Sequence, residues 1–543
     1  MSVRSIRRLA YIGLTTVVLG AFSALSASAD PSGSSPLQWA AAGNANPKSP
    51  GLVAPDNLST SLRQVAVAQG ATKLENGTTA VPLYGYDGDK PVLVPLPTAP
   101  TVEAHKTEPD KNTYLVFPRG LAGADAAYDY GRHFLFQGHE SGTPGYITRI
   151  NLDADQAHRV TLLATQDVAG KNLPDFDGST WDPFARRLLF TAELGNQGGV
   201  WQSDLSVPAR VQDISGVTGR GGYEGIQSDN RGNLYIVEDV GGAGGPTTPN
   251  AKQPNSFVYR LLPTDPSDLT KGGRLQALQV INGDHPITFH AGQNDADILG
   301  ADVASIHTYG QSLPTRWVTL HDTAVDGTTP FDANALAKAR EATPFKRPEN
   351  GVFAPDGSFR HFYFTETGDT NATTQADAAH GGFGALLRLT QDPTRDTGSL
   401  GLFYRGDVMH TGLDNLSFVG PTALAAVEDA GDTLHTQRNA LDSGYVFDIT
   451  ASYASGRQPL RFLAQGRDAS ATIDSACGSA CGNDGDNEIT GIHTSNGDPS
   501  TLGVLGAVRP RLFTAGWRLF YTRQHGDNVT FEILPGSADE TRS

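Results

Sequence analysis

Acidic residues recur at both ends of a short repeated pattern. In the clearest copy, Tyr223-Glu224-Gly225-Ile226 precedes a turn-forming segment, Asp229-Asn230-Arg231-Gly232, and a second apolar run that ends at Glu238. Such a copy predicts two short antiparallel strands around a tight turn, so both acids return to the same end of a hairpin. Three copies have acid-to-acid spacings of 14, 17 and 14 residues, in the pairs Glu224 with Glu238, Glu349 with Glu366, and Asp414 with Glu428.

Weaker copies, which contain Glu140, Glu193 and Glu488, bring the number of units to six. Further strand-like segments lie between the units and would supply outer strands. Four antiparallel strands per unit, repeated about six times, predict an all-β fold, a six-bladed β-propeller with short helical insertions. One insertion is expected at residues 332–342, where Asp332 is suited to cap a helix.

The N-terminal 29 residues have the pattern of a signal peptide. Arg4, Arg7 and Arg8 precede an apolar stretch, and Ala27-Ser28-Ala29 forms a small-residue cleavage site. The Arg7-Arg8 pair favours twin-arginine export, with general secretion as the alternative. We therefore expect a secreted or periplasmic protein with a signal peptide at 1–29, a partly flexible N-terminal extension at 30–107 and a propeller domain at 108–543.

Composition limits the classes of partner. The formal net charge of −17 argues against binding nucleic acid or an anionic membrane through a basic surface. The charge is compatible with a cation-binding site or simply with solubility. The two cysteines, Cys477 and Cys481, are candidates for a local disulfide in an exported protein, and no Cys/His pair with zinc spacing accompanies them.

The inner strands of a propeller line a central channel, so acids at their ends are expected to meet near its axis. Hard carboxylate oxygens favour Ca²⁺, Mg²⁺ or Mn²⁺ and can also hold Fe³⁺. Any one acid could instead cap a turn or form a surface ion pair, but recurrence in six units favours a shared site. The candidate metal ligands are Glu140, Glu193, Glu224, Glu349, Asp414 and Glu488, and Glu238, Asp239, Glu366, Glu428 and Asp429 could also converge.

Arg347 lies two residues before Glu349 at the entry to a predicted strand. A guanidinium in this position could bind a phosphate oxygen bidentately, or it could neutralise the neighbouring carboxylates. The chain has no Gly-x-Ser-x-Gly elbow, no phosphate-binding P-loop and no His-Glu-x-x-His motif, so those mechanisms have no support.

The ordered set of motifs resembles the PhoX-type alkaline phosphatase family. The matching segments, in family order, are Gly138-His139-Glu140, Val237-Glu238-Asp239, Arg347-Pro348-Glu349, Leu413-Asp414-Asn415-Leu416, Glu488-Ile489-Thr490-Gly491 and Gln524-His525-Gly526. The resemblance implies a six-bladed propeller that hydrolyses small phosphate monoesters with calcium and iron. It marks Glu193, Glu349, Asp414 and Glu488 as the best-matched ligand positions, and Arg347 and Glu349 as catalytic residues.

One departure concerns the iron. Family members place a cysteine ligand before a tryptophan segment, but residues 173–181 contain Asp175 and Asp177 and no cysteine. Either aspartate replaces it, or the iron site differs or is missing, so calcium is the expected metal and Fe³⁺ stays in question. Two other functions remain open: a non-catalytic, calcium-stabilised binding propeller and a lactonase-type propeller hydrolase. The oligomeric state is left open.

Overall fold

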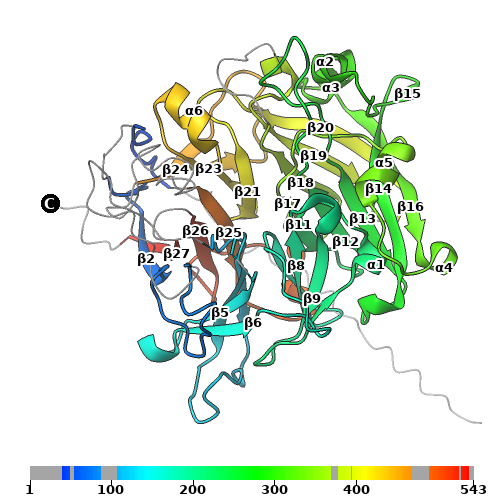
Figure 1. Cartoon of the computed structure of the whole chain (residues 1–543). Coiled ribbons are helices and arrows are strands. Elements are labelled where there is room, and N and C mark those ends of the chain that lie inside the picture. The colour runs from blue at the N-terminus through cyan, green and yellow to red at the C-terminus, as the bar shows by residue number, and fades with distance from the viewer. Residues whose placement is uncertain are drawn as a thin grey trace, which may run out of the picture. The chain divides into compact units, whose positions relative to one another are not determined.

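A computed structural model describes residues 39–48, 54–86, 107–142, 144–368, 377–392, 394–466, 488–524 and 528–536. All of them belong to one compact unit, Leu37–Ser543. They form mainly antiparallel strands with a few short helices (Figure 1), which confirms the predicted all-β class. The expected signal peptide at 1–29 lies outside these residues. Within the described part of the chain, no helix has the length and apolar character needed to cross a membrane.

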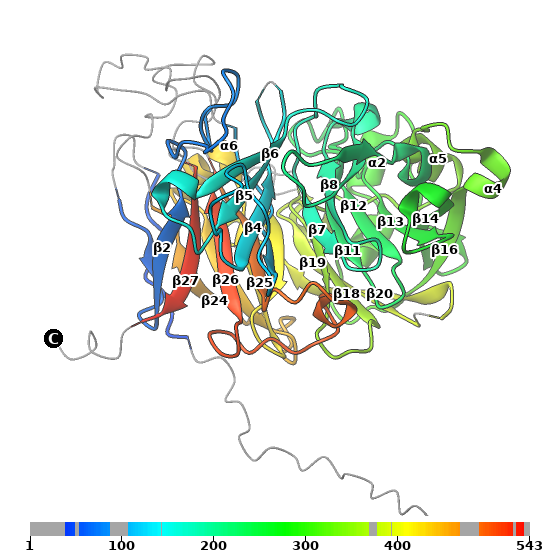
Figure 2. The same cartoon turned by 90° about the horizontal axis from the view of Figure 1, so that it is seen from below.

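Four separate sheets surround a common centre (Figures 1 and 2). The first contains β3 (Thr113–Val116), β4 (His133–Gly138), β5 (Ile147–Asn151) and β6 (Val160–Ala164). The second contains β7 (Ser179–Asp182), β8 (Arg187–Ala192), β9 (Gly199–Ser203) and β10 (Val211–Asp213). The third contains β21 (Leu413–Phe418), β22 (Ala423–Glu428), β23 (Ser443–Asp448), β24 (Leu460–Ala464) and β1 (Asn57–Leu58). The fourth contains β25 (Ile489–Ser495), β26 (Arg518–Arg523), β27 (Val529–Pro535) and β2 (Leu62–Ala68).

A fifth sheet has ten strands among the described residues. It contains β11 (Tyr223–Ser228), β12 (Leu234–Glu238), β13 (Val258–Pro263), β14 (Gly273–Asn282), β15 (His285–Pro286), β16 (Leu313–Asp322), β17 (Gly351–Phe353), β18 (His361–Glu366), β19 (Ala385–Gln391) and β20 (Thr397–Arg405). Strand β16 pairs with β14 on one side and with β20 on the other. The propeller-like arrangement is therefore confirmed, but the prediction of six separate blades is wrong. One long strand satisfies the free edges of two neighbouring four-stranded groups and joins them.

Six strands of the described chain form a closed inner ring. Each contacts the next in the order β3, β7, β11, β17, β21, β25 and back to β3. The ten-stranded sheet supplies two of them, β11 and β17, from its two edges. The first strand of every four-stranded run therefore faces the centre, as expected for the repeated hairpin.

The N-terminal part of the described chain completes two sheets. Strand β1 pairs with β24, and β2 pairs with β27 near the C-terminus. Both strands come from the range 30–107, which the sequence predicted as an extension. Figure 2 shows β2 beside β27 in side view.

Local sequence explains the hairpins and the helix. The Asp229 carboxylate accepts hydrogen bonds from the backbone N–H groups of Arg231 and Asn233, and Gly232 takes a left-handed φ of 79°, so the chain reverses between β11 and β12. Asp332 caps the predicted helix by accepting a bond from Ala335 N–H. The short helices are α1 (Ser215–Thr218), α2 (Asn294–Ile298), α3 (Ala301–Ile306), α4 (Thr323–Asp326), α5 (Ala333–Ala339) and α6 (Gly431–Arg438).

Candidate metal centre

An acidic residue lies at the start of every inner strand. These acids are Asp110, Asp177, Glu224, Glu349, Asp414 and Glu488, and we call them the carboxylate ring. The first five are at most 5% exposed, so they are withdrawn from bulk water. The ring contains the sequence-predicted residues Glu224, Glu349, Asp414 and Glu488.

Irregular pairing turns several of these acids inward. The register between β11 and β12 shifts between Tyr223 and Ile226, which brackets Glu224. The register between β21 and β22 shifts in the same way around Asp414. A bulge of this kind bends a strand and changes the direction of a side chain. The segments Glu224-Gly225-Ile226 and Asp414-Asn415-Leu416 both lie at such a bulge.

A second set of polar side chains follows the neighbouring strands at the same end of the channel. Glu140 follows β4, Glu193 follows β8, Asp239 follows β12 and Asp429 follows β22. Glu140 accepts a hydrogen bond of 2.9 Å from Gln524 Nε2. The predicted ligands Glu140 and Glu193 therefore lie beside the ring, and Glu193 is exposed.

Two groups of carboxylates have spacing that suits a metal ion. One joins Asp110, Glu140 and Asp177, and the other joins Glu224, Asp239 and Glu349. In each group, one oxygen from every member lies within 4.8 Å of the others. Oxygen-only donor sets of this kind suit hard cations such as Ca²⁺.

The ring acids resist ionisation. Burial is the largest cause in every case, and it raises the pKa of Asp110, Asp177, Glu224, Asp414 and Glu488 above the ordinary values. Burial and the Asp239 charge raise the pKa of Glu349 to about 8. Carboxylates packed together hold protons unless cations balance their charge.

Two ring oxygens are left without hydrogen-bond partners among the described residues. These atoms are Oδ1 of Asp177 and Oε2 of Glu224, both buried. An unsatisfied buried carboxylate oxygen is costly, and a coordinated cation would satisfy it. The side chains present therefore fit a hard metal cation. Of the two aspartates in the segment where the family resemblance leads us to expect a cysteine, Asp177 belongs to one of these groups.

Arg347 lies against this centre. Its guanidinium donates to Asp239 through Nε, at 3.1 and 2.8 Å, and through Nη2, at 2.7 Å, and Nη2 lies 3.2 Å from Glu349. The side chain is 27% exposed, so part of it faces solvent. Arg347 also has a left-handed φ of 57°, a costly conformation for a residue with a β-carbon.

Lys111 is a buried cation that the sequence interpretation missed. Its Nζ donates to Asn415 Oδ1 at 2.6 Å and to the Ile492 carbonyl at 3.2 Å. Burial lowers its pKa to about 8, although the nearby carboxylates oppose this effect. The charges that act on it come from Asp414, Asp110, Glu224 and Asp177 in the ring.

Asp110 was also missed, because the sequence interpretation recognised the first unit only by Glu140. The segment Asp110-Lys111-Asn112 precedes β3 as Glu349 precedes β17. An acid directly before a short apolar strand was therefore the signal that could have found it.

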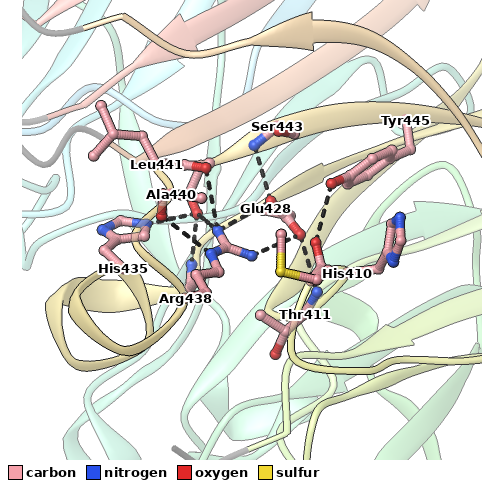
Figure 3. Close-up of polar contacts among 12 residues, drawn as sticks. His410, Thr411, Glu428, His435, Arg438, Ala440, Leu441, Ser443 and Tyr445 are labelled. Atoms are coloured by element: carbon pink, nitrogen blue, oxygen red, sulfur yellow. Dashed lines mark hydrogen bonds and ion pairs between the residues drawn. The ribbon is translucent and has the colours of Figure 1, made fainter. Parts of the chain in front are cut away.

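Three predicted convergent acids turn away from the channel. Glu238 accepts bonds from the Tyr259 hydroxyl, Asn334 Nδ2 and Phe257 N–H. Glu366 Oε2 bonds His307 Nε2 at 2.7 Å. Glu428 is held by both Nη atoms of Arg438 at 3.2 Å (Figure 3). These buried glutamates lie at strand ends and fix neighbouring segments, so their expected place in the channel was wrong.

The other end of the inner ring is covered. Residues of β3, β7, β11 and β25 and the segment around Gly503–Leu505 line a partly open pocket of about 30 Å³. Trp181 Nε1 donates to the Pro499 carbonyl across this end. Cys477 and Cys481, the disulfide candidates, lie outside the described residues.

Comparison with known proteins identifies a similar fold. No model of a known protein family matches the sequence, and no curated protein matches it. Among solved structures, Pseudomonas fluorescens PhoX in complex with vanadate, a transition state analogue, aligns with 91% of this chain and 98% of its own. The TM-score is 0.52 and the sequence identity is 11%, so the likeness shows a PhoX-like fold. A putative 6-phosphogluconolactonase from Bacteroides uniformis covers 78% of this chain and 82% of its own, with 11% identity and a TM-score of 0.27.

Proposed function

We propose that this protein is an exported, metal-dependent phosphomonoesterase that hydrolyses small phosphate esters at the carboxylate ring. The observation that carries the proposal is the partly exposed Arg347, held by Asp239 and Glu349 beside buried carboxylates with metal-suited spacing. The PhoX-like fold supports it, because that PhoX structure contains vanadate.

The two carboxylate groups would hold the cations. Glu224, Asp239 and Glu349 would form one site, and Asp110, Glu140 and Asp177 the other. When bound, such ions neutralise phosphoryl charge and act as Lewis acids. Calcium is the expected metal, and iron would have to bind without the family's cysteine.

Arg347 would bind the phosphate oxygens. Asp239 restrains one edge of the guanidinium through Nε and Nη2, which fixes the plane of the group before a substrate arrives. A planar, permanently charged guanidinium is suited to phosphate. Preorganised positive charge of this kind stabilises the transition state of phosphoryl transfer. Glu349 contacts both Arg347 and the Glu224 group, so it would align the phosphate-binding and metal-binding parts.

Export rests on the pattern in residues 1–29. Cleavage after Ala29 predicts a mature chain that begins at Asp30. N-terminal sequencing of protein from the culture medium or periplasm tests this, and an uncleaved chain confined to the cytoplasm contradicts it.

The central experiment measures metal content and phosphatase activity in one preparation. We expect bound calcium, hydrolysis of p-nitrophenyl phosphate, loss of that activity after chelation, and recovery when the metal is returned. Full activity after complete metal removal would overturn the mechanism. Calcium without turnover would favour the binding propeller, and hydrolysis of lactones but not phosphate esters would favour the lactonase.

A further inference from the structure

Arg347 has a backbone conformation that its surroundings have to maintain. Its φ of 57° is left-handed, which is costly for a residue with a β-carbon. The Arg347 carbonyl accepts hydrogen bonds from Thr367, from the backbone N–H at 3.0 Å and from Oγ1 at 3.3 Å. The Lys346 carbonyl accepts a bond from the Gly368 N–H at 3.2 Å. Both carbonyls are thereby tied to the two residues that follow β18.

Lys346, directly before Arg347, is a buried cation that the proposed mechanism does not use. Its side chain is 1% exposed, and its Nζ donates to Asp377 Oδ2, which is also buried, at 2.8 Å. Its backbone N–H donates to Glu366 Oε1 at 2.8 Å. These two contacts and the bond from Gly368 to the Lys346 carbonyl form what we call the Lys346 anchor.

The Glu366 end of the anchor is itself fixed. Glu366 Oε2 bonds His307 Nε2 at 2.7 Å, and His307 Nδ1 donates to the Val303 carbonyl at 2.8 Å. Glu366 and His307 are both buried. The anchor therefore connects the segment at Arg347 to α3 through a buried chain of hydrogen bonds.

The Asp377 end of the anchor leads to a glycine-rich segment beside Arg347. The Asp377 carbonyl accepts a bond from the Gly382 N–H at 3.1 Å. A β-carbon on Gly368 would lie 2.5 Å from the Gly382 carbonyl oxygen, so the two glycines pack directly on each other. Arg347 Nη1 lies 3.5 Å from the Gly368 carbonyl oxygen. Lys346 therefore holds both the backbone of Arg347 and a residue that the guanidinium contacts.

We propose that Lys346 is a positioning residue for phosphate binding: its ion pair with Asp377 keeps Arg347 in the left-handed conformation that directs the guanidinium along Asp239 and Glu349. The inference rests on the proposed phosphate-binding role of Arg347. Relaxation of the Arg347 backbone to an ordinary φ would move the guanidinium relative to Asp239. Loss of the anchor should therefore weaken phosphate binding and leave the metal ligands in place.

The test is the binding of inorganic phosphate, measured by calorimetry and as inhibition of p-nitrophenyl phosphate hydrolysis. We expect Lys346→Met to weaken phosphate binding by about tenfold or more, because the guanidinium is no longer held in place, and to leave the calcium content unchanged. A double-mutant cycle with Arg347→Ala shows whether the effect passes through the guanidinium. In the Arg347→Ala background, Lys346→Met should change phosphate binding by less than about twofold. Equal losses in both backgrounds would show a purely structural role and overturn the proposal.

Arg438→Met is the matched control for general damage to the fold. It also breaks a buried ion pair, in which Arg438 contacts Glu428 and Asp442. It should lower stability and leave the Kd for phosphate within about twofold of wild type. A loss of phosphate binding as large as that in Lys346→Met would contradict the proposal.

A second variant covers the case in which Lys346→Met does not fold. Removing one partner of a buried pair leaves an uncompensated charge, so the neutral double variant Lys346→Met/Asp377→Asn is measured beside the single one. If the neutral variant folds, wild-type phosphate binding overturns the proposal, and binding weaker by about tenfold or more supports it. If neither variant folds, the pair serves folding and the positioning role is rejected.

The wild-type preparation separates this inference from the proposed function. Wild type that binds phosphate but hydrolyses no ester removes the phosphatase proposal, and the calorimetric comparison still tests Lys346. Wild type that binds no phosphate removes both. An active wild type whose phosphate binding is unchanged in Lys346→Met removes the Lys346 inference alone.

Discussion

The Glu349 carboxylate takes part in several interactions of the centre at once. Its carboxylate lies 3.2 Å from Arg347 Nη2 and accepts a 2.7 Å bond from Thr367 Oγ1. It also belongs to the group with Glu224 and Asp239. Burial and the Asp239 charge raise the pKa of Glu349 to about 8. The carboxyl group therefore needs a bound cation or a proton near neutral pH.

Glu349→Gln should lower phosphatase activity at least 100-fold and remove part of the bound metal, because an amide loses the anionic oxygen that a hard cation needs. Metal analysis and steady-state kinetics check both effects. Glu238→Gln is the matched control, since Glu238 is buried but lies outside the ring. Unchanged metal stoichiometry in Glu349→Gln would remove Glu349 from the ligands.

At the scale of the elements, three of the hairpins have two acidic ends with different roles. The acid at the start of the first strand faces the channel. The second strand ends at a buried glutamate, which is Glu238, Glu366 or Glu428. Strand alternation explains the difference, because successive side chains point to opposite faces. The Asp239 side chain therefore lies at the centre. The Glu238 side chain, one residue earlier, accepts hydrogen bonds from Tyr259, Asn334 and Phe257.

Glu238 predicts a pH effect on stability. Burial raises its pKa to about 7 in the folded protein, so the folded state holds a proton that the unfolded state has released. Its stabilising contribution is complete below about pH 4.5 and falls as the pH rises towards 7. A shift of this size corresponds to about 3 kcal/mol. Urea unfolding from pH 5 to 8 should show Glu238→Gln gaining stability relative to wild type as the pH increases; parallel curves would contradict this account.

The Arg438 interaction predicts a large cost for breaking a buried ion pair. Arg438 is 1% exposed and contacts Glu428 (Figure 3). It also contacts Asp442, at 2.9 Å. Arg438→Met should lower the free energy of unfolding by about 3–5 kcal/mol, because it leaves buried carboxylates without their cation. The control is Arg395→Met, in an exposed pair with Asp392, which should cost at most about 1 kcal/mol. Urea unfolding measures the loss of stability in each variant. Similar losses would contradict the expected difference between the buried and the exposed ion pair.

At the scale of the molecule, the ring of inner strands depends on contacts between distant parts of the chain. Strand β2 pairs with β27 through residues Leu62–Ala68 and Thr530–Pro535. Leu62 packs in the same core cluster as Ile533 and Phe462. The N-terminal segment thus supplies the outermost strand of the last sheet.

Removing that strand should weaken the whole fold. A chain that starts at residue 70 is expected to melt at a lower temperature and to aggregate more readily than one that starts at residue 60, which lacks β1 but retains β2. Thermal unfolding followed by circular dichroism, with light scattering, makes the comparison. Equal melting temperatures would show that β2 contributes little to closure.

The sequence by itself determined the hairpins and the position of most acids. The turn at Asp229–Gly232, the cap at Asp332 and the acids Glu224, Glu349, Asp414 and Glu488 depend on local residue types and spacing, which act over a few residues. Short-range chemistry of this kind can be interpreted without coordinates.

Tertiary structure alone decided which groups share the centre. Strand β16 joins two four-stranded groups through pairings between residues about 85 positions apart, such as Leu313 and Leu400, so the number of separate sheets was not visible in the repeat. Lys111 meets Asn415 from another sheet for the same reason. A carboxylate at a strand end can face the channel, or it can face a lysine or a buried arginine. Packing between strands far apart in the chain decides between these environments, and the spacing of residues along the sequence does not.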